Sequence, residues 1–396
     1  MMTARAQNSI VVLLGAGASV DAGLLTSFAL TEAIYTDLRG NWIQQSKLSR
    51  LVGYLIAKLQ LRKAKQGDGP FQAIDIEELF DALNSLLNRN TSVLSEFVER
   101  WDGFLDTFDD EIDVHAMERG FASSVMDVVR RNIDRRGGFP DTFGLGSQLR
   151  SFVSALRPKS HFGMTTREAD LFRAPFMQAL VSRLTTAEEA GDYFSPLLSN
   201  RRVGVVATLN YDLVVENCCK RIDREYDHGL SRWDQQRSLN WKTGGQLRLL
   251  TLHGSVNWTG TPDEVTVNPG EVHPNQRRVM VFGGAGQKLS ASGPFLQFLT
   301  SFERAIMKSG HLLVIGYSFR DAHINAVLRR WRLTRRQSKL TIVDPGVPIL
   351  RDTGLSAGVL ERQVGGKTAT YVLDVEHIKA GAAEGIQRFF DEPTLV

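Results

Sequence analysis

Cysteine is almost absent from this sequence of 396 residues, which has only the adjacent pair Cys218 and Cys219. Neighbouring cysteines rarely form a disulfide, and no second pair exists to build a disulfide framework. Two cysteines also cannot supply a four-cysteine zinc site, so we expect no zinc and no other bound metal. Free thiols are typical of a reducing compartment, which favours a cytoplasmic location.

Long apolar runs and an excess of one charge are also missing. No stretch approaches the roughly 18 apolar residues of a membrane span, and Ile10–Leu14 is too short for the core of a signal peptide. The sequence has 47 basic and 44 acidic residues, a net charge of +3. This balance gives no case for a polyanion-binding surface. We therefore expect no membrane association and no direct nucleic-acid binding.

The pattern of apolar residues predicts an α/β fold with a doubly wound parallel sheet. Short β-branched runs alternate with helical stretches such as Pro294–Lys308 and Asp321–Arg332, which is typical of this fold class. The predicted strands are Ser9–Leu14, Val203–Thr208, Arg248–Leu252, Val279–Phe282, Leu312–Ile315, Leu340–Val343 and, as a weaker candidate, Thr370–Leu373.

Predicted helices dominate residues 45–190, where no convincing strand occurs. They are Ser46–Lys65, Ile76–Leu87, Thr91–Phe108 and Arg167–Leu184. The chain is too long for a typical single core. We therefore predict a discontinuous Rossmann-like domain, residues 1–40 plus 200–396, interrupted by a helical insertion over residues 41–199.

The first candidate site is the turn Gly15–Ser19 (GAGAS), between the first strand and a helix predicted over Val20–Leu38. A glycine pair lets the backbone approach a pyrophosphate, and free N–H groups follow at the helix start, where Ser19 can act as the cap. The third glycine of a dehydrogenase fingerprint is absent, because Val20 stands there. A tight turn without a ligand is the alternative.

Polar residues also follow four later strands, where ligands of open α/β sheets bind. Thr208–Asp212 (TLNYD) ends one strand, and Asp212 could instead cap the next helix. His253 follows another strand as a candidate general base, against a purely structural role. Gly316 and Ser318 form a second glycine turn. Asp344 can accept hydrogen bonds from a ribose diol or can simply start a turn before Pro345.

These motifs, in this order, resemble the sirtuin-like nucleotide-binding domain, and most of all the bacterial sirtuin-like NADases of anti-phage defence. The resemblance rests on GAGAS, TLNYD, LHGS, GYSFRD (316–321) and VDP (343–345), with Ile76–Phe80 as an acidic-apolar helix of that group. It implies a Rossmann-like sheet with NAD as the substrate and with Asn210 and His253 as the catalytic pair. The implied NAD-binding residues are Gly15, Ala16, Gly17, Ser19, Asp21, Thr208, Asp212, Gly316, Ser318 and Asp344.

Deacetylating sirtuins carry a structural zinc held by two cysteine pairs, which this sequence cannot supply. Water then becomes the expected acceptor, so the resemblance implies a glycohydrolase releasing nicotinamide and ADP-ribose. A protein deacylase or ADP-ribosyltransferase is one alternative, and a module that senses NAD without turnover is another. The resemblance also implies a homo-oligomer and a HerA-type hexameric ATPase as partner, since this chain has no Walker motif of its own.

Overall fold

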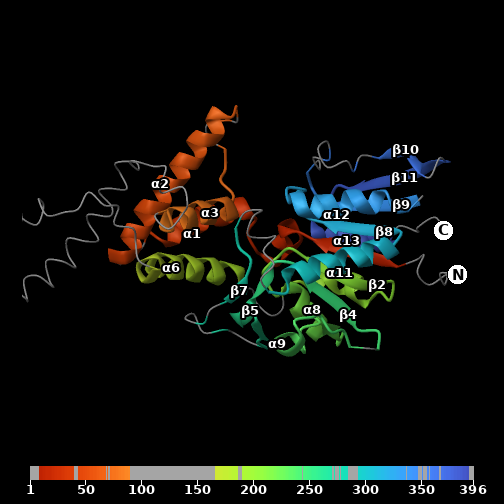
Figure 1. Ribbon diagram of the computed structural model, residues 1–396, viewed down its shortest axis with the longest axis horizontal. Helices are drawn as coiled ribbons and strands as arrows, with labels where there is room; N and C mark the ends of the chain where they lie inside the picture. The colour runs from red at the N-terminus through yellow and green to blue at the C-terminus, as the bar shows by residue number, and fades with distance from the viewer. Residues whose placement is uncertain are drawn as a thin grey trace, which may run out of the picture. The chain divides into compact units, whose positions relative to one another are not determined.

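The computed structural model describes residues 9–39, 43–67, 69, 72–89, 166–185, 190–242, 244–269, 272, 276, 278–283, 293–335, 337–346, 350, 355, 357–364 and 367–391 (Figure 1). The chain divides into two compact units, residues 1–82 with 174–396 and residues 83–173. The main sheet lies in the first unit. The predicted insertion boundaries, 41–199, stay a prediction, and the helix predicted over Thr91–Phe108 lies outside the described residues.

The main sheet confirms the predicted α/β fold with a doubly wound, mostly parallel sheet. Its pairs are all parallel except β10 with β11, which is antiparallel. The strands lie in the order β10 (Gly358–Val364), β11 (Lys367–Ile378), β9 (Gln337–Val343), β8 (His311–Ile315), β1 (Ile10–Leu14), β2 (Val203–Thr208), β4 (Leu247–Thr251) and β3 (Tyr226–Asp227).

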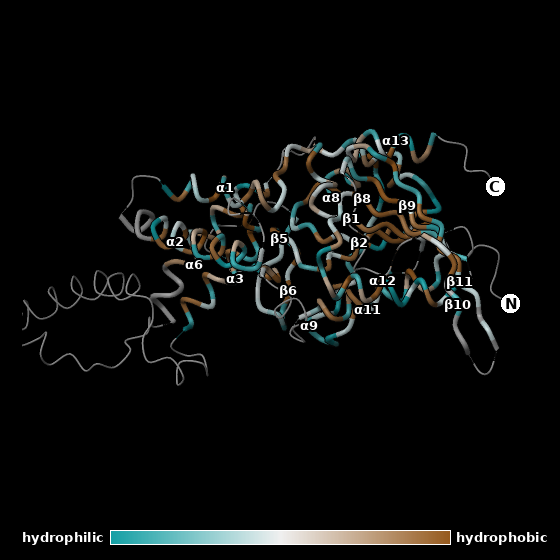
Figure 2. Tube along the Cα trace, turned by 90° about the horizontal axis from the view of Figure 1, so that it is seen from above, coloured by the Kyte–Doolittle hydropathy of each residue, from teal (hydrophilic) through white to brown (hydrophobic). Residues whose placement is uncertain are grey.

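Helices cover both faces of this sheet, because side chains alternate along each strand. Val11 and Leu13 of β1 belong to the core that includes α11 (Phe295–Lys308) and α12 (Ala322–Arg332). The alternate residues of β1 belong to the opposite core, together with α7 (Ser195–Ser199), α8 (Val214–Arg221) and α13 (Ala382–Asp391). Figure 2 shows the central strands as the most hydrophobic part of this unit.

A second sheet of three strands holds one segment that the sequence pattern assigned to the main sheet. Its order is β6 (Glu264–Val267), β5 (Gly254–Thr261) and β7 (Arg278–Met280), and both pairs are antiparallel. The prediction that Val279–Phe282 joins the parallel sheet is therefore wrong. Strand β5 follows β4 through a turn, with no helix to carry the chain back for a parallel strand, so β5 starts a separate antiparallel sheet, which β7 joins.

The helix predicted over Val20–Leu38 is two separate elements. A 3-10 helix, η2 (Ala16–Ala22), ends at Gly23, whose φ of +83° is left-handed, and α1 (Ser27–Asp37) begins only after an extended segment. Glycine takes this conformation without the penalty that a Cβ brings, so the chain turns here.

The remaining described elements are all helices. They are α2 (Ile43–Lys65), α3 (Ile76–Leu87), α6 (Thr166–Leu184), η4 (Asp192–Phe194) and α9 (Trp233–Gln236). Across the described part of the chain, no helix combines the length and the apolar character needed to cross a membrane. Helix α8 contains Cys218 and Cys219, whose thiols are free and buried.

Candidate functional site

The carboxyl ends of five neighbouring strands lie level with one another. Leu14, the last residue of β1, pairs with Thr208 of β2 and with Ile315 of β8. Thr208 pairs with Thr251 of β4, and Ile315 pairs with Val343 of β9. The residues that follow these strands therefore leave the sheet at one edge. It is the edge at which open α/β sheets bind ligands.

A pocket of about 330 Å³ opens at this edge, a size within the range of small-molecule sites. We call it the strand-end pocket. Most of the predicted site residues line it, namely Gly15, Ala16, Gly17, Ser19, Asn210, Asp212, His253, Gly316, Ser318 and Asp344. Residues far apart in the sequence thus meet in one cavity.

The two glycine turns contact each other directly. The Gly15 N–H donates to Ile315 O and the Gly17 N–H to Gly316 O, both at 2.9 Å. A Cβ on Gly15 would lie 2.6 Å from Gly316 O, and one on Gly316 would lie 2.2 Å from Ala18 N. Glycine is needed because two backbones touch. The N–H groups of Gly15 and Gly17 are therefore used inside the fold, so any N–H that binds a phosphate comes from another residue.

Asn210 is fixed by three hydrogen bonds. Its side-chain Nδ2 donates to Gly15 O (3.0 Å) and to Ser19 Oγ (2.9 Å), and its backbone N–H donates to Thr208 Oγ1 (3.0 Å). The Ser19 hydroxyl in turn hydrogen-bonds Asp212. Both amide hydrogens of Asn210 are used in this way, so its Oδ1 is the side-chain atom that remains to accept a hydrogen bond from a ligand.

Ser19 and Asp212 support this network from within the fold. Ser19 is buried inside η2, whose N-cap position is Gly15, so the predicted capping role of Ser19 is wrong. Asp212 Oδ1 accepts the Val214 N–H at 3.1 Å at the start of α8, although the N-cap position of that helix is Leu213 and not Asp212. Burial raises the pKa of Asp212 above its usual value. Its carboxylate nonetheless lines the strand-end pocket.

Asp21 and Thr208 do not line the strand-end pocket. The Asp21 carboxylate accepts the Ala383 N–H at 2.7 Å, which ties η2 to the start of α13. Thr208 contacts the pocket lining indirectly, because its Oγ1 accepts the backbone N–H of Asn210. In the structure, Asp21 therefore links two helices and Thr208 orients Asn210.

His253 lies in the turn between β4 and β5 and is buried. The turn is set by Gly254, whose φ is +85° and at which a Cβ would lie 2.3 Å from Val279 O. The Val281 N–H donates to His253 O at 2.8 Å. The Gly254 turn and the Val281 N–H therefore fix the backbone of His253, which lines the strand-end pocket.

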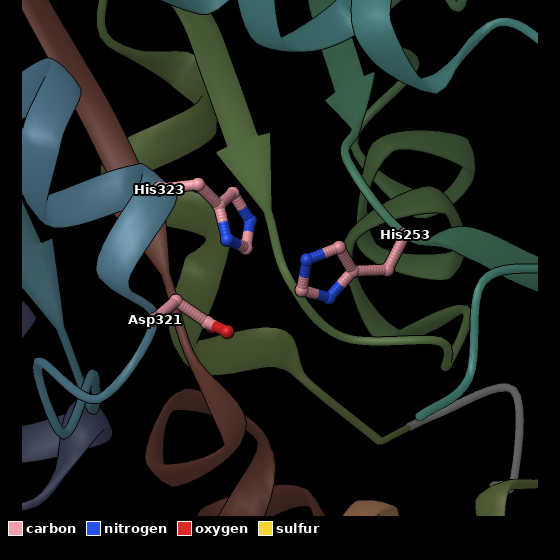
Figure 3. Close-up of side chains that lie close together, drawn as sticks. All are labelled: His253, Asp321 and His323. Atoms are coloured by element: carbon pink, nitrogen blue, oxygen red, sulfur yellow. The ribbon is translucent and has the colours of Figure 1, made fainter. Parts of the chain in front are cut away.

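Two residues that the sequence did not single out lie beside His253. Asp321 is the N-cap of α12 and His323 is in its first turn. Ligand atoms of His253, Asp321 and His323 all lie within 4.8 Å of one another, and Figure 3 shows the three side chains turned toward a common point. Asp321 belongs to the GYSFRD motif, but only its place at the helix start was used in the prediction.

Helix α3 also begins at the strand-end pocket, although its residues belong to the predicted insertion. Glu77 Oε1 lies 2.9 Å from the Tyr211 hydroxyl, which lies 2.8 Å from Val281 O. Burial, and then Glu77, raises the pKa of Tyr211 well above its usual value. Asp75 accepts the Ser27 hydroxyl at 2.7 Å. The residues around Ile76–Phe80 thus contribute acidic side chains to the site.

Ser318 and Asp344 close the pocket from β8 and β9. Ser318 is exposed at the turn after β8, next to Phe319, whose φ of +56° is uncommon for a side chain of this size. Asn325 Nδ2 donates to Phe319 O at 2.7 Å and holds this conformation. Asp344 Oδ1 accepts the Gly346 N–H at 2.8 Å, so the turn-forming alternative is seen, while Asp344 also lines the pocket.

The described lining of the pocket is acidic. It includes one arginine, Arg320, and five carboxylates, which belong to Asp75, Glu77, Asp212, Asp321 and Asp344. Arg320 lies 3.9 Å from Asp75 and over the ring of Phe28, 4.4 Å from its centroid. Such a lining favours a cationic group within the pocket and offers one guanidinium to an anion.

Comparisons with known proteins find similarity to SIR2-like proteins. A model of the SIR2-like domain matches residues 204–353, which include the loops after β2, β4, β8 and β9. No curated protein matches the sequence.

Three solved Sir2 structures are similar at low identity. A Sir2 complex with the inhibitor EX-527, 2′-O-acetyl-ADP-ribose and a deacetylated p53 peptide is 13% identical, with a TM-score of 0.30, over 52% of this chain and 73% of that one. A mutant Sir2 homologue with 2′-O-acetyl-ADP-ribose is 13% identical, with a TM-score of 0.33, over 59% and 81%. A third Sir2 enzyme is 15% identical, with a TM-score of 0.31, over 57% and 81%. Scores this low add no argument, so the fold rests on the strand order.

Proposed function

We propose that this chain is an NAD glycohydrolase, which cleaves NAD to nicotinamide and ADP-ribose. The observation that carries the proposal is the level alignment of the five strand ends, which brings Asn210 and His253 into one pocket. The match of residues 204–353 to the SIR2-like domain supports NAD as the substrate.

The chemistry assigns a role to each residue. The bond between the ribose C1′ and the nicotinamide nitrogen breaks, and its electron pair leaves with nicotinamide. Water forms the new bond to C1′ and its proton passes to His253, directly or through a ribose hydroxyl. Asn210 Oδ1, held by the hydrogen bonds of Nδ2, orients the ribose and the water.

The acidic lining fits the charge that develops in this reaction. Departure of nicotinamide leaves a sugar with oxocarbenium character, and the positive charge is stabilised by nearby carboxylates such as Asp321. The pyrophosphate of NAD is anionic, and Arg320 is the lining side chain that pairs with it. Ser318 and Asp344 contact the phosphates and the adenosine ribose in this proposal.

An enzyme that destroys NAD must be restrained, so we propose that activity depends on assembly. By the sequence resemblance, the chain works in the cytoplasm in anti-phage defence, as a homo-oligomer with a HerA-type hexameric ATPase. A monomer with full activity, measured by native mass and NAD consumption, would contradict this part.

The direct test is chromatography of the products after NAD is incubated with the pure chain, alone and together with the product of the neighbouring gene. Nicotinamide and ADP-ribose in equal amounts support the proposal. His253→Ala should lower the rate by roughly 10²–10⁴-fold, the usual contribution of a general base. A folded His253→Ala that keeps the wild-type rate rules out the mechanism. Strict dependence on an acylated peptide identifies a deacylase, and tight NAD binding without products identifies a sensor.

A further inference from the structure

The proposed base and two side chains beside it form a set of metal-ligand type. His253 follows β4, Asp321 occupies the N-cap position of α12 and His323 lies one residue beyond the start of that helix. Two imidazoles and one carboxylate are a ligand set that zinc uses with a fourth position left open. They come from two loops that meet only because β4 and β8 end at the same edge of the sheet.

The spacing of the ligand atoms fits one ion after small movements. The nitrogen and oxygen atoms lie within 4.8 Å of one another. Zinc bonds of about 2.0–2.2 Å place neighbouring ligand atoms roughly 3.3 Å apart in a tetrahedral site. Side-chain rotations that move each ligand atom by about 1 Å therefore bring all three atoms onto one ion.

The backbones that carry the three residues are already fixed. The Asp321 N–H donates to the Tyr317 hydroxyl at 3.2 Å, and the Asn325 N–H donates to Asp321 O at 2.9 Å. His253 is held by the Val281 N–H at its carbonyl oxygen. A metal site needs such support, because ligands on rigid elements lose little freedom when the ion binds.

The acidic side chains around the three residues favour binding of a cation. The described pocket lining has five carboxylates against one arginine, so a divalent ion offsets repulsion between acidic groups. Imidazole nitrogen suits zinc, cobalt and nickel, whereas magnesium and calcium prefer sites built from oxygen. The class of ion is thus a divalent transition metal.

We propose that His253, Asp321 and His323 bind a divalent transition metal ion of the zinc class, and that the bound ion stops NAD hydrolysis. The imidazole lone pair that accepts a proton from water is then bonded to the metal, so His253 can no longer act as the base. The metal site stands by itself, whereas the inhibition rests on the proposed glycohydrolase. The ion would be one device that restrains the enzyme.

Metal binding is tested first, on the metal-stripped full-length chain. Co²⁺ is followed by its visible absorption and Zn²⁺ by calorimetry, in wild type and in His323→Ala. Asp321→Asn is a second variant that keeps the size of the cap residue. We expect one ion per chain and a loss of affinity of at least about 10-fold in both variants. His377→Ala, which removes an exposed histidine outside the set, should bind as wild type does.

No binding at micromolar metal, or equal affinity in wild type and both variants, overturns the site. Activity is tested next by NAD hydrolysis with increasing Zn²⁺ and then a chelator, each variant being compared with its own metal-free rate. Wild type should be inhibited and then restored by the chelator, and His323→Ala should need at least about 10-fold more Zn²⁺. Activation by Zn²⁺ overturns the inhibitory role. Cobalt binding without NAD hydrolysis under any condition refutes the glycohydrolase and the inhibition together, and leaves the metal site standing.

Discussion

The sharpest test of the site is Asn210→Asp, which keeps the shape of the side chain and replaces two hydrogen-bond donors with acceptors. In the wild type, Nδ2 donates to Gly15 O and Ser19 Oγ, and the Ser19 hydroxyl hydrogen-bonds Asp212. The introduced carboxylate faces Gly15 O with no hydrogen between them. The single hydroxyl hydrogen of Ser19 can then be donated either to the introduced carboxylate or to Asp212, but not to both.

Two polar contacts are lost at a buried position, at roughly 1–3 kcal/mol each, so the free energy of unfolding should fall by about 2–6 kcal/mol. The ligand-facing oxygen also moves, and a displacement of the order of 1 Å costs roughly 10²-fold in rate. The first quantity is measured by denaturant unfolding and the second by release of nicotinamide from NAD.

Asn257→Asp is the matched control. Asn257 is buried in β5, outside the strand-end pocket, and its Nδ2 donates to Asn268 O at 2.8 Å. This change should cost about 1–3 kcal/mol of stability and leave the rate of hydrolysis unchanged. If Asn210→Asp is no less stable than Asn257→Asp and hydrolyses NAD at the wild-type rate, the reasoning about the Asn210 network is refuted.

Three further predictions concern charge, packing and pH. Arg320→Ala should raise KM for NAD about 10-fold with little change in kcat, because Arg320 is the pocket residue that can pair with a phosphate, as steady-state kinetics would show. Gly316→Ala should lower the stability by more than about 3 kcal/mol, since a Cβ would lie 2.2 Å from a backbone nitrogen and φ is +61°. Burial raises the pKa of Glu216 to about 8, so the folded chain binds a proton that the unfolded chain releases above pH 4.5. Stability should therefore fall as the pH rises from 6.5 to 8. In Glu216→Gln, the melting temperature should depend less on pH over that range.

Each of these predictions has its own control. Equal KM values for Arg320→Ala and wild type would remove the phosphate role. Gly204→Ala, where no heavy atom lies within 4 Å of the new Cβ, should cost far less than Gly316→Ala, and similar losses would contradict the packing argument. Burial lowers the pKa of His228, 3.8 Å from Glu216, to about 4, so His228 lowers stability only as the pH falls below 6.5. A stability loss above pH 6.5 that Glu216→Gln keeps would exclude Glu216 as its cause.

The local pattern of apolar residues was sufficient to predict the central strands. Val203–Thr208 has the predicted bounds, and β1 and β8 differ from the prediction by one residue each. Buried parallel strands are continuous apolar runs, which any window of the sequence reveals. The edge strands were harder to predict. Strand β10 was not predicted, because Glu361, Arg362 and Gln363 interrupt its apolar pattern, and its partner β11 was predicted only in part.

Turn geometry was beyond the reach of the same pattern. A helical period runs through Val20–Leu38, yet Gly23 takes a left-handed conformation and the chain breaks there. Val279–Phe282 has a strand-like composition, but its partner is decided by the turn at Gly254, which starts an antiparallel sheet. Composition predicts that a segment is extended, whereas pairing depends on distant residues.

The sequence by itself determined the strand-end motifs, and with them the class of fold and the candidate pair Asn210 and His253. Only the tertiary structure decided what each polar atom contacts. It used the N–H groups of Gly15 and Gly17 inside the fold, placed Asp21 outside the pocket and brought Asp321 and His323 to His253. The physical reason is that a motif is a local property of the chain, whereas a hydrogen-bond partner or a metal ligand is set by the register of strands far apart in the sequence.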